Sequence, residues 1–406
     1  MDLFSGLLGK KGFREQLVSE AAGIHGKFPK KIVFADTDDF VLSAASLVKR
    51  RRIASPIILG DSDKLRASFR RLGLANLETE DILDYLFAEN SEILEGYAKD
   101  YLAMRKARGK LLSDKEAIER MSRSSFYAAM MVRKGLADGM ISGASAATKP
   151  YQPAMEIIGL VKGVSKMSGA FFMSKDSGEA YLFSDCGINM SPNSEHLAEA
   201  AWLSARTASA AGLIPKVAML SFSTNGSSRH LSVERVKLAT AMLKRKDSSI
   251  LVDGDIQVDA AINPEVMKRK CPDSPLKGSA NVLIFPDLNS ANISYKLLER
   301  LGGYYALGPL LLGLEKPAND IALGSSAQAV FYLCAATVIQ AANPLKPEEV
   351  GFRDVEKGEA RVNEDAQRKK AASDPLDLLP SNVRKIIEEG RKSAAKDEDS
   401  DVSKGA

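Results

Sequence analysis

The sequence predicts an α/β protein with a largely parallel sheet, because strand-like apolar runs alternate with helical stretches through most of its length. Residues 31–35 form the first such run, a helix is expected at about 40–51, and residues 55–60 close the first β-α-β unit. The chain has 406 residues, of which 45% are hydrophobic, so it can bury a large core. This length favours two domains over one.

Five later runs each read as a buried strand that ends in small, polar or acidic residues. They span residues 139–143, 180–184, 216–222, 250–253 and 281–285. Open α/β sheets bind ligands just beyond the carboxyl ends of their strands. We therefore expect the functional residues at these strand ends.

Composition excludes several classes of protein. No apolar run approaches the ~20 residues that a membrane-spanning helix needs, and residues 1–10 are too short and too lightly charged for a secretory signal, so we expect a cytoplasmic protein. The net charge of +4 is small against 56 basic and 52 acidic residues, and no basic stripe carries interleaved aromatics, which argues against nucleic acid. Cysteines and histidines are few and lack metal-ligand spacing, so no metal site is expected.

Six separate segments carry motifs. Residues 316–330 read K-P-A-N-D-I-A-L-G-S-S-A-Q-A-V, residues 285–296 read F-P-D-L-N-S-A-N-I-S-Y-K, and residues 253–261 read D-G-D-I-Q-V-D-A-A. The others are A-D-G-M-I-S-G-A at 137–144, S-D-C-G-I-N at 184–189 and S-F-S-T-N-G-S at 221–227. Together they resemble the phosphotransacetylases (phosphate acetyl- and butyryltransferases) over roughly residues 31–342.

The resemblance implies two Rossmann-like α/β domains with the active cleft between them. The first domain would comprise residues 1–163 and 310–342, and the second residues 164–309. The family transfers an acetyl group reversibly between acetyl phosphate and coenzyme A, and it usually dimerises through the second domain. A homodimer is therefore expected, with coenzyme A or acetyl-CoA as a ligand rather than a tightly bound cofactor.

The chain departs from the family at the residues that would carry the chemistry. The thiol of coenzyme A, with a free pKa of about 8.5, must lose its proton to a positioned carboxylate, and the phosphate calls for arginines. In the family pattern K-P-x-N-D-L-S-R-G-x-x-x-x-D, the serine falls at Ala322, the arginine at Leu323 and the acid at Ala329. Gln152 stands where a further arginine precedes a proline.

Other positions of the resemblance keep groups that can bind an anion. The family's remaining arginine matches Arg105, and the nearby cation Lys149 could substitute for the arginine lost at Gln152, although it lacks a bidentate guanidinium. Asp320 is either a replacement base or the cap of a following helix, and Asp36 is expected in a solvated acidic loop. The predicted substrate-binding residues are Arg105, Arg108, Ser142, Gly143, Thr148, Ser325 and Ser326.

Two functions of different class follow from these departures. The chain is predicted to be a catalytically weak or silent relative that binds ligands of the coenzyme A or acyl phosphate type, or serves as a dimeric scaffold. The alternative is an active phosphate acyltransferase with substituted catalytic groups. A dehydrogenase is excluded because no G-x-G-x-x-G follows a strand.

The last part of the chain, residues 343–406, is rich in charged residues and small side chains and is expected to be a largely disordered tail. Within it, residues 381–389 predict a short amphipathic helix with Ser381 as its cap and Val383, Ile386 and Ile387 on one face. Such a helix is too short to be stable alone. It could dock on the body of the protein, bind a protein partner or stay disordered.

Overall fold

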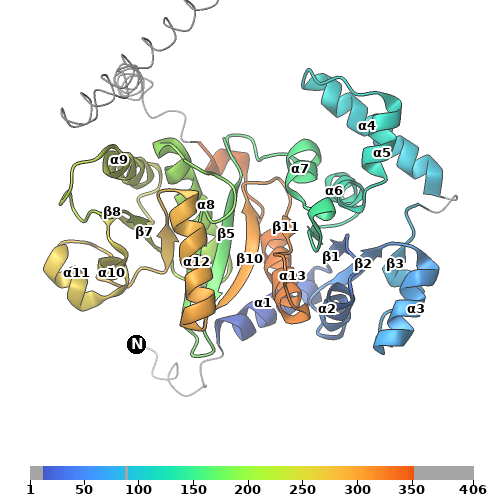
Figure 1. The fold of residues 1–406 in the computed structure, drawn as a ribbon, viewed down its shortest axis with the longest axis horizontal. Helices are drawn as coiled ribbons and strands as arrows, with labels where there is room; N and C mark the ends of the chain where they lie inside the picture. Colours follow the sequence, from blue (N-terminus) through green and yellow to red (C-terminus); the bar gives the residue numbers. More distant parts are fainter. Residues whose placement is uncertain (1–11, 87–89, 352–406) are drawn as a thin grey trace, which may run out of the picture. The chain divides into compact units, whose positions relative to one another are not determined.

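The computed structural model describes residues 12–86 and 90–351 (Figure 1). Its strands form a five-stranded sheet in the order β11-β4-β1-β2-β3 and a six-stranded sheet in the order β10-β5-β6-β9-β7-β8. The strands are β1 (Lys31–Phe34), β2 (Ser55–Leu59), β3 (Ile82–Leu83), β4 (Gly139–Ser142), β5 (Ser168–Ser174), β6 (Ala180–Ser184), β7 (Lys216–Leu220), β8 (Leu251–Ile256), β9 (Val282–Ile284), β10 (Tyr305–Leu312) and β11 (Ala318–Asp320).

Helices connect these strands and cover both faces of each sheet. Among the residues that the structure describes, no helix is long and apolar enough to cross a membrane. The helices are α1 (Phe13–Lys27), α2 (Asp39–Arg50), α3 (Ser62–Leu72), α4 (Ser91–Ala107), α5 (Asp114–Met121), α6 (Ser124–Lys134), α7 (Tyr151–Pro153), α8 (Ser194–Ala210), α9 (Leu231–Lys246), α10 (Val258–Ile262), α11 (Pro264–Lys270), α12 (Leu288–Gly302) and α13 (Ala327–Ala342).

The first sheet is parallel throughout, with β1 between β2 and β4 and with β11 beside β4. Its central strand is buried on both faces. Ile32 and Phe34 pack in the core that includes residues of α1, α2 and α13, whereas Val33 packs on the opposite face with residues of α4, α5 and α6. This alternation explains why β1 reads as a continuous apolar run.

The second sheet is mixed. β6, β9, β7 and β8 are parallel neighbours, and β5 pairs antiparallel with both β6 and β10. Phe172 faces the core that contains Trp202 of α8, whereas Phe171 stacks on Tyr295 of α12 on the other face. Because each sheet has helices on both faces, the chain contains two α/β domains, as the sequence predicts.

The seven predicted strands correspond to β1, β2, β4, β6, β7, β8 and β9, and the helix predicted at 40–51 is α2. Sequence reasoning missed β3, β5, β10 and β11. Gly308 and Pro309 interrupt β10 and shift its register with β5, and β11 has only three residues, two of them polar. The domain boundary predicted at residue 310 falls inside β10.

The described chain continues past α13 as far as Gly351. Glu349 forms an ion pair of 2.9 Å with Arg206 of α8, and Val350 is 9% exposed and adjoins Gly163. The start of the predicted tail therefore contacts the second sheet's helix α8. The amphipathic helix predicted at 381–389, with Ser381, lies outside the described residues.

Candidate functional site

Three strands of the first sheet bring polar residues together at their carboxyl ends. Asp36 follows β1, Ser142 ends β4, and Asp320 ends β11 in register with Ser142. Between them Gly143 has a φ of +116°, and its N–H donates to Oδ2 of Asp36 over 2.8 Å. A Cβ at Gly143 would overlap Oδ1 of Asp320, so only glycine fits here. The site therefore lies where open α/β sheets bind ligands.

Asp320 is the centre of a buried polar network. Its side chain is 3% exposed, and the ammonium of Lys149 lies 2.8 Å from Oδ1 and 3.0 Å from Oδ2. The hydroxyl of Tyr151 donates to Oδ2 over 2.7 Å, and Lys149 also donates to the carbonyl oxygen of Ile321 over 2.9 Å. The carboxylate thus has a cation and a hydroxyl donor as partners, which a buried charge requires.

The alternative that Asp320 caps the following helix is wrong. Ser326 is the cap of α13, and its hydroxyl accepts a hydrogen bond from the N–H of Ala329 over 3.2 Å. Asp320 lies six residues earlier, inside β11, and bonds to Lys149 and Tyr151 instead. The carboxylate is consequently available to the site rather than to the helix end.

Burial dominates the electrostatics of this network. It raises the pKa of Asp320, against the opposing effect of Lys149 and Tyr151, and the charge of Asp36 adds to the rise. Burial also raises the pKa of Asp36, which hydrogen bonds from Thr148, Ala144 and Gly143 oppose. Asp36 is 4% exposed, so the expectation of a solvated acidic loop is wrong for this residue. The site therefore contains two buried carboxylates, and Lys149 pairs with Asp320.

Tyr151 remains a neutral hydroxyl donor in the site. Burial raises its pKa far above the ordinary range, and the negative charge of Asp320 acts in the same direction. Tyr295 of α12 and Asp185, which follows β6, contribute further to this rise. Because both belong to the second domain, Tyr151 lies within electrostatic reach of both domains.

A second cluster surrounds the carboxylate of Glu156, in the short π-helix Ala154–Ile158. Arg105 lies 3.0 Å from Oε1 and Arg120 lies 3.2 Å from Oε2. Gln152 donates to Oε1 over 3.2 Å, and the hydroxyl of Tyr101 also hydrogen-bonds to the carboxylate. Arg105 is thus already paired, and its Nε is buried without a partner among the described residues.

The helix α7 links the two clusters, because its neighbouring residues Tyr151 and Gln152 bind Asp320 and Glu156 respectively. Sequence reasoning missed Glu156 and Tyr151, which belong to no motif. The sequence does hold one signal for Glu156. It lies four residues after Gln152, and residues four apart meet on one face of a helix. Arg108 does not face either carboxylate, and it donates to the carbonyl oxygens of Met155 and Glu156.

Of the positions where the final motif lacks the family's reactive residues, Ala322 and Leu323 lie on the turn between β11 and α13, and Ala329 lies in the first turn of α13. Leu323 is 71% exposed, whereas Ala322 and Ala329 are half-buried. The hydroxyl of Ser326 is used in the helix cap, and that of Ser325 has no hydrogen-bond partner within residues 12–86 and 90–351. Of the two serines predicted to bind substrate, Ser325 therefore has the free hydroxyl.

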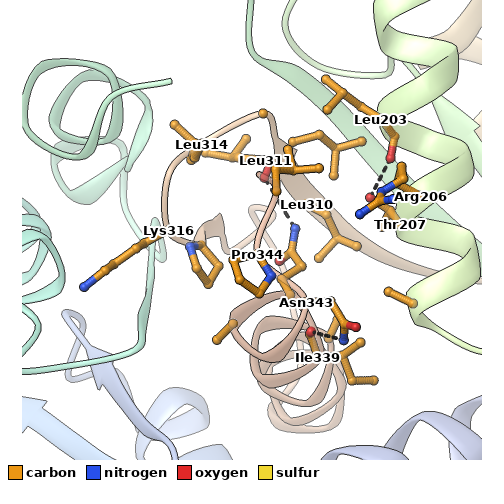
Figure 2. Close-up of a pocket in the computed structure, with 18 of the residues that line it drawn as sticks. Leu203, Arg206, Thr207, Leu310, Leu311, Leu314, Lys316, Ile339, Asn343 and Pro344 are labelled. Carbon is orange, nitrogen blue, oxygen red and sulfur yellow. Dashed lines mark hydrogen bonds between the residues drawn. The ribbon is translucent and has the colours of Figure 1, made fainter. Parts of the chain in front are cut away.

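A cavity of about 540 Å³ lies elsewhere in the molecule (Figure 2). It is lined by α8, β10 and the end of α13, and by Asp138 and Pro317, which precede β4 and β11. Asp138 and Pro317 thus lie at the amino ends of β4 and β11, whereas Ser142 and Asp320 lie at the carboxyl ends of the same strands. Figure 2 shows Lys316 pointing away from the cavity, and its ammonium donates to the carbonyl oxygen of Val132 over 2.8 Å.

Within the described part of the chain, no group of three or more His, Cys, Asp or Glu side chains could hold a metal ion. The three cysteines are free and buried, and burial raises the pKa of the Cys186 thiol well above its ordinary value. None of these thiols is thus poised as a nucleophile.

Known proteins of one family are similar to this chain over most of its length. The family model described as phosphate acetyl/butaryl transferase matches residues 13–338. A phosphate acetyltransferase of Bacillus subtilis (strain 168) is 39% identical over 313 residues, which cover 77% of this chain and 94% of that protein. A phosphate acetyltransferase of Thermoanaerobacterium thermosaccharolyticum is 39% identical over 320 residues, covering 77% and 95% of the two chains.

Solved structures show the same similarity. The EutD phosphotransacetylase from Staphylococcus aureus superposes with a TM-score of 0.72 at 36% identity, covering 81% of this chain and 99% of that chain. A phosphotransacetylase from Streptococcus pyogenes gives a TM-score of 0.73 at 37% identity, covering 81% and 98%. The matched family region ends at residue 338, so Glu349, which pairs with Arg206, lies beyond it.

The ion pair between Lys149 and Asp320 predicts that the variant Lys149→Met loses stability in a pH-dependent way. At pH 7 we expect the free energy of unfolding to fall by about 3 kcal/mol, because a buried carboxylate loses its cation. The unpaired Asp320 would then have a folded-state pKa even further above its unfolded value. Stability of the variant is therefore highest below the unfolded pKa and falls as the pH rises through the folded pKa.

Urea denaturation at pH 5 and pH 7.5 measures this effect. The difference from the natural protein should be larger at pH 7.5. The control is Lys162→Met, which removes an exposed lysine and should change little at either pH. An equal loss at both pH values in Lys149→Met would contradict the assignment of Asp320 as the group left unpaired.

Proposed function

Because this chain belongs to the phosphate acetyl/butaryl transferase family, we propose that it transfers an acyl group between phosphate and the thiol of coenzyme A. The supporting observation is its 39% identity to proteins named phosphate acetyltransferase, over 94–95% of their length. This similarity favours an active transferase over the silent relative that the lost motif residues suggest.

The reaction needs a base for the thiol, and Ala329 cannot supply one. Asp320 is the carboxylate that we propose in its place. It is buried at the carboxyl end of β11, and burial raises its pKa, which makes it a stronger base than an exposed aspartate. Lys149, bound to it, supplies positive charge near the position where the family has an arginine and this chain has Gln152.

The phosphate of the substrate needs donors and cations. We propose Arg105 and the hydroxyl of Ser325 for this role, since the N–H of Gly143 already donates to Asp36. Arg105 keeps its guanidinium close to α7 through Glu156. Coenzyme A would be a substrate that exchanges with solvent and not a resident cofactor.

Full-length protein should therefore consume coenzyme A thiol in the presence of acetyl phosphate. The rate is expected to stay below ~10 s⁻¹, the ordinary range for enzymes, because the family's acid and two arginines are absent. Asp320→Asn should lower it by a further ~10²–10⁴ if Asp320 is the base. Asp273→Asn, which changes an exposed aspartate, is the control.

Two outcomes of this thiol assay would count against the proposal. Thiol consumption that Asp320→Asn leaves unchanged would remove Asp320 as the base. No consumption, with calorimetric binding of coenzyme A, would instead establish the silent relative. The pairing of Arg105 with Glu156 favours that second candidate, because a bound arginine is not free for substrate.

The Glu156 cluster predicts two variants with opposite effects on coenzyme A affinity. Arg105→Ala should weaken binding by ~1–3 kcal/mol, because a charge-assisted hydrogen bond to phosphate is lost. Glu156→Gln should strengthen binding, because it releases Arg105 from its carboxylate partner. Isothermal calorimetry measures both, with Arg300→Ala, an exposed arginine on α12, as the control. A change of the same sign in both variants would argue for a structural role of the pair.

We also propose a homodimer that forms through α12. Ile293, Leu297 and Leu301 are 57%, 52% and 81% exposed and recur every four residues, so they form an apolar stripe on one face of this helix. A second copy of the chain would cover that stripe.

Leu297→Glu combined with Leu301→Glu should convert the dimer to a monomer, because two charges cannot be buried in an apolar interface. Sedimentation equilibrium measures the mass. Leu111→Glu changes a leucine that is 92% exposed on a loop and should leave the dimer intact. A dimer that survives the double substitution would place the interface elsewhere.

Three free thiols fit a reducing compartment, and we propose the cytoplasm.

We propose that the segment with Val383, Ile386 and Ile387 binds a protein partner by its apolar face.

A further inference from the structure

The cavity of about 540 Å³ at the amino ends of β4 and β11 has an apolar interior (Figure 2). Its volume lies within the range of pockets that hold small molecules. Helix α8, which packs on the second sheet, and helix α13, which packs on the first, both line it. The apolar walls are side chains that are at most 3% exposed, namely Leu17, Phe172, Leu203, Leu310, Leu312 and Ile339. A molecule that fills this space must therefore have an apolar body.

The charged residues around the cavity differ in what they can still bind. Lys316 points away from it, and Asp138 pairs with Lys30 over 3.2 Å. Glu315 is exposed to solvent. Among the described charged residues that line the cavity, Arg206 remains, and Figure 2 shows it pointing from α8 toward the cavity. The cavity thus has one available cation at its edge.

Arg206 already binds a carboxylate from within the chain. Its Nη2 donates to Oε2 of Glu349 over 2.9 Å, and its other nitrogens make no hydrogen bond within residues 12–86 and 90–351. A guanidinium carries five N–H donors, so most of them are unused. The two side chains are 40% and 30% exposed, and ion pairs with such exposure are weak. A carboxylate from solution can therefore replace that of Glu349.

We propose that this cavity binds an aliphatic monocarboxylate, with its hydrocarbon chain against the leucine side chains and its carboxylate on Arg206 in place of Glu349. The planar guanidinium fork matches the geometry of a carboxylate, and the chain leaves water for an apolar surface. The bound molecule would contact both α8 and α13. It would lie at the end of the strands opposite to Asp320, so this site is separate from that of the proposed acyl transfer.

The charge of the ligand follows from Arg206. A cation would be repelled by the guanidinium, and a neutral alcohol would leave Arg206 bound to Glu349. One carboxylate is sufficient, because the cavity has one available cation.

Octanoate is the probe, because it has one carboxylate and an unbranched apolar chain. Calorimetric titration of the full-length protein at pH 7.5 should show a single octanoate site. Acetate, which lacks the chain, and 1-octanol, which lacks the charge, should each bind at least ~10-fold more weakly. Trp202, the single tryptophan of the chain, gives a second readout, because Cζ of Arg206 lies 5.7 Å from the centre of its ring. Its fluorescence emission should change as octanoate binds.

The two residues of the ion pair should change octanoate affinity in opposite directions. Arg206→Gln should weaken binding about 10-fold or more, because a charge-assisted hydrogen bond is lost. Glu349→Gln should strengthen binding roughly threefold, because the competing carboxylate is removed. Arg50→Gln changes an exposed arginine on α2 and is the control. A pair that serves stability alone would not produce opposite shifts.

A larger side chain inside the cavity tests where octanoate binds. Ala336 lines the cavity and is 3% exposed, so Ala336→Leu should weaken binding by occupying part of the space. Ala103→Leu, on the exposed surface of α4, is the control. Circular dichroism identifies a variant that fails to fold, and the variants of Arg206 and Glu349, both partly exposed, then carry the test.

Three results would overturn the proposal: no octanoate binding, binding that Arg206→Gln leaves unchanged, or equal affinity for octanoate and 1-octanol. The titrations involve no turnover. Failure of the thiol assay consequently leaves this site in place, and failure of octanoate to bind leaves the proposed transferase in place.

Discussion

The site depends on one constraint, which is that a carboxylate buried at a sheet edge must have partners. Asp320 ends β11 with a side chain that is 3% exposed, and water cannot solvate its charge there. Lys149 supplies the opposite charge and Tyr151 a hydrogen bond. Position 143 accepts only glycine, because Oδ1 of Asp320 occupies the space that a Cβ would need. The identities of several residues between β4 and α7 thus follow from a single carboxylate.

The same principle explains the Glu156 cluster. Arg105 and Arg120 surround one carboxylate, and Gln152 completes the group from a helix position four residues earlier. A guanidinium at position 152 would add a third positive charge to this group, so the glutamine is consistent with Glu156 being satisfied internally. Asp320 and Glu156 therefore both have partners within the protein. The question for function is which of these partners a substrate can displace.

Much of the fold could be predicted from sequence, because buried parallel strands read as continuous apolar runs. The seven predicted strands show this signal, whereas β11 has only three residues and β10 is interrupted by Gly308 and Pro309. The proximity of Asp320, Ser142 and Gly143 was predictable too, since these residues lie in motifs at the ends of parallel strands. Their partners were not, because hydrogen bonding between Tyr151 and Asp320, 169 residues apart, leaves no local pattern. The helix cap shows the same limit. Serine and aspartate are both preferred caps, so the sequence does not choose between Ser326 and Asp320. The position of β11, which ends at Asp320, decides in favour of Ser326.

An arginine held for substrate and a lysine paired within the protein differ in what they offer to chemistry. A guanidinium fixed for phosphate stabilises developing charge without any rearrangement. A lysine that first binds an aspartate must leave that partner, so part of the binding energy of phosphate is used to break the pair. The pair of Lys149 with Asp320 therefore lowers the affinity that this cation can offer to phosphate, while it balances the charge of a buried carboxylate.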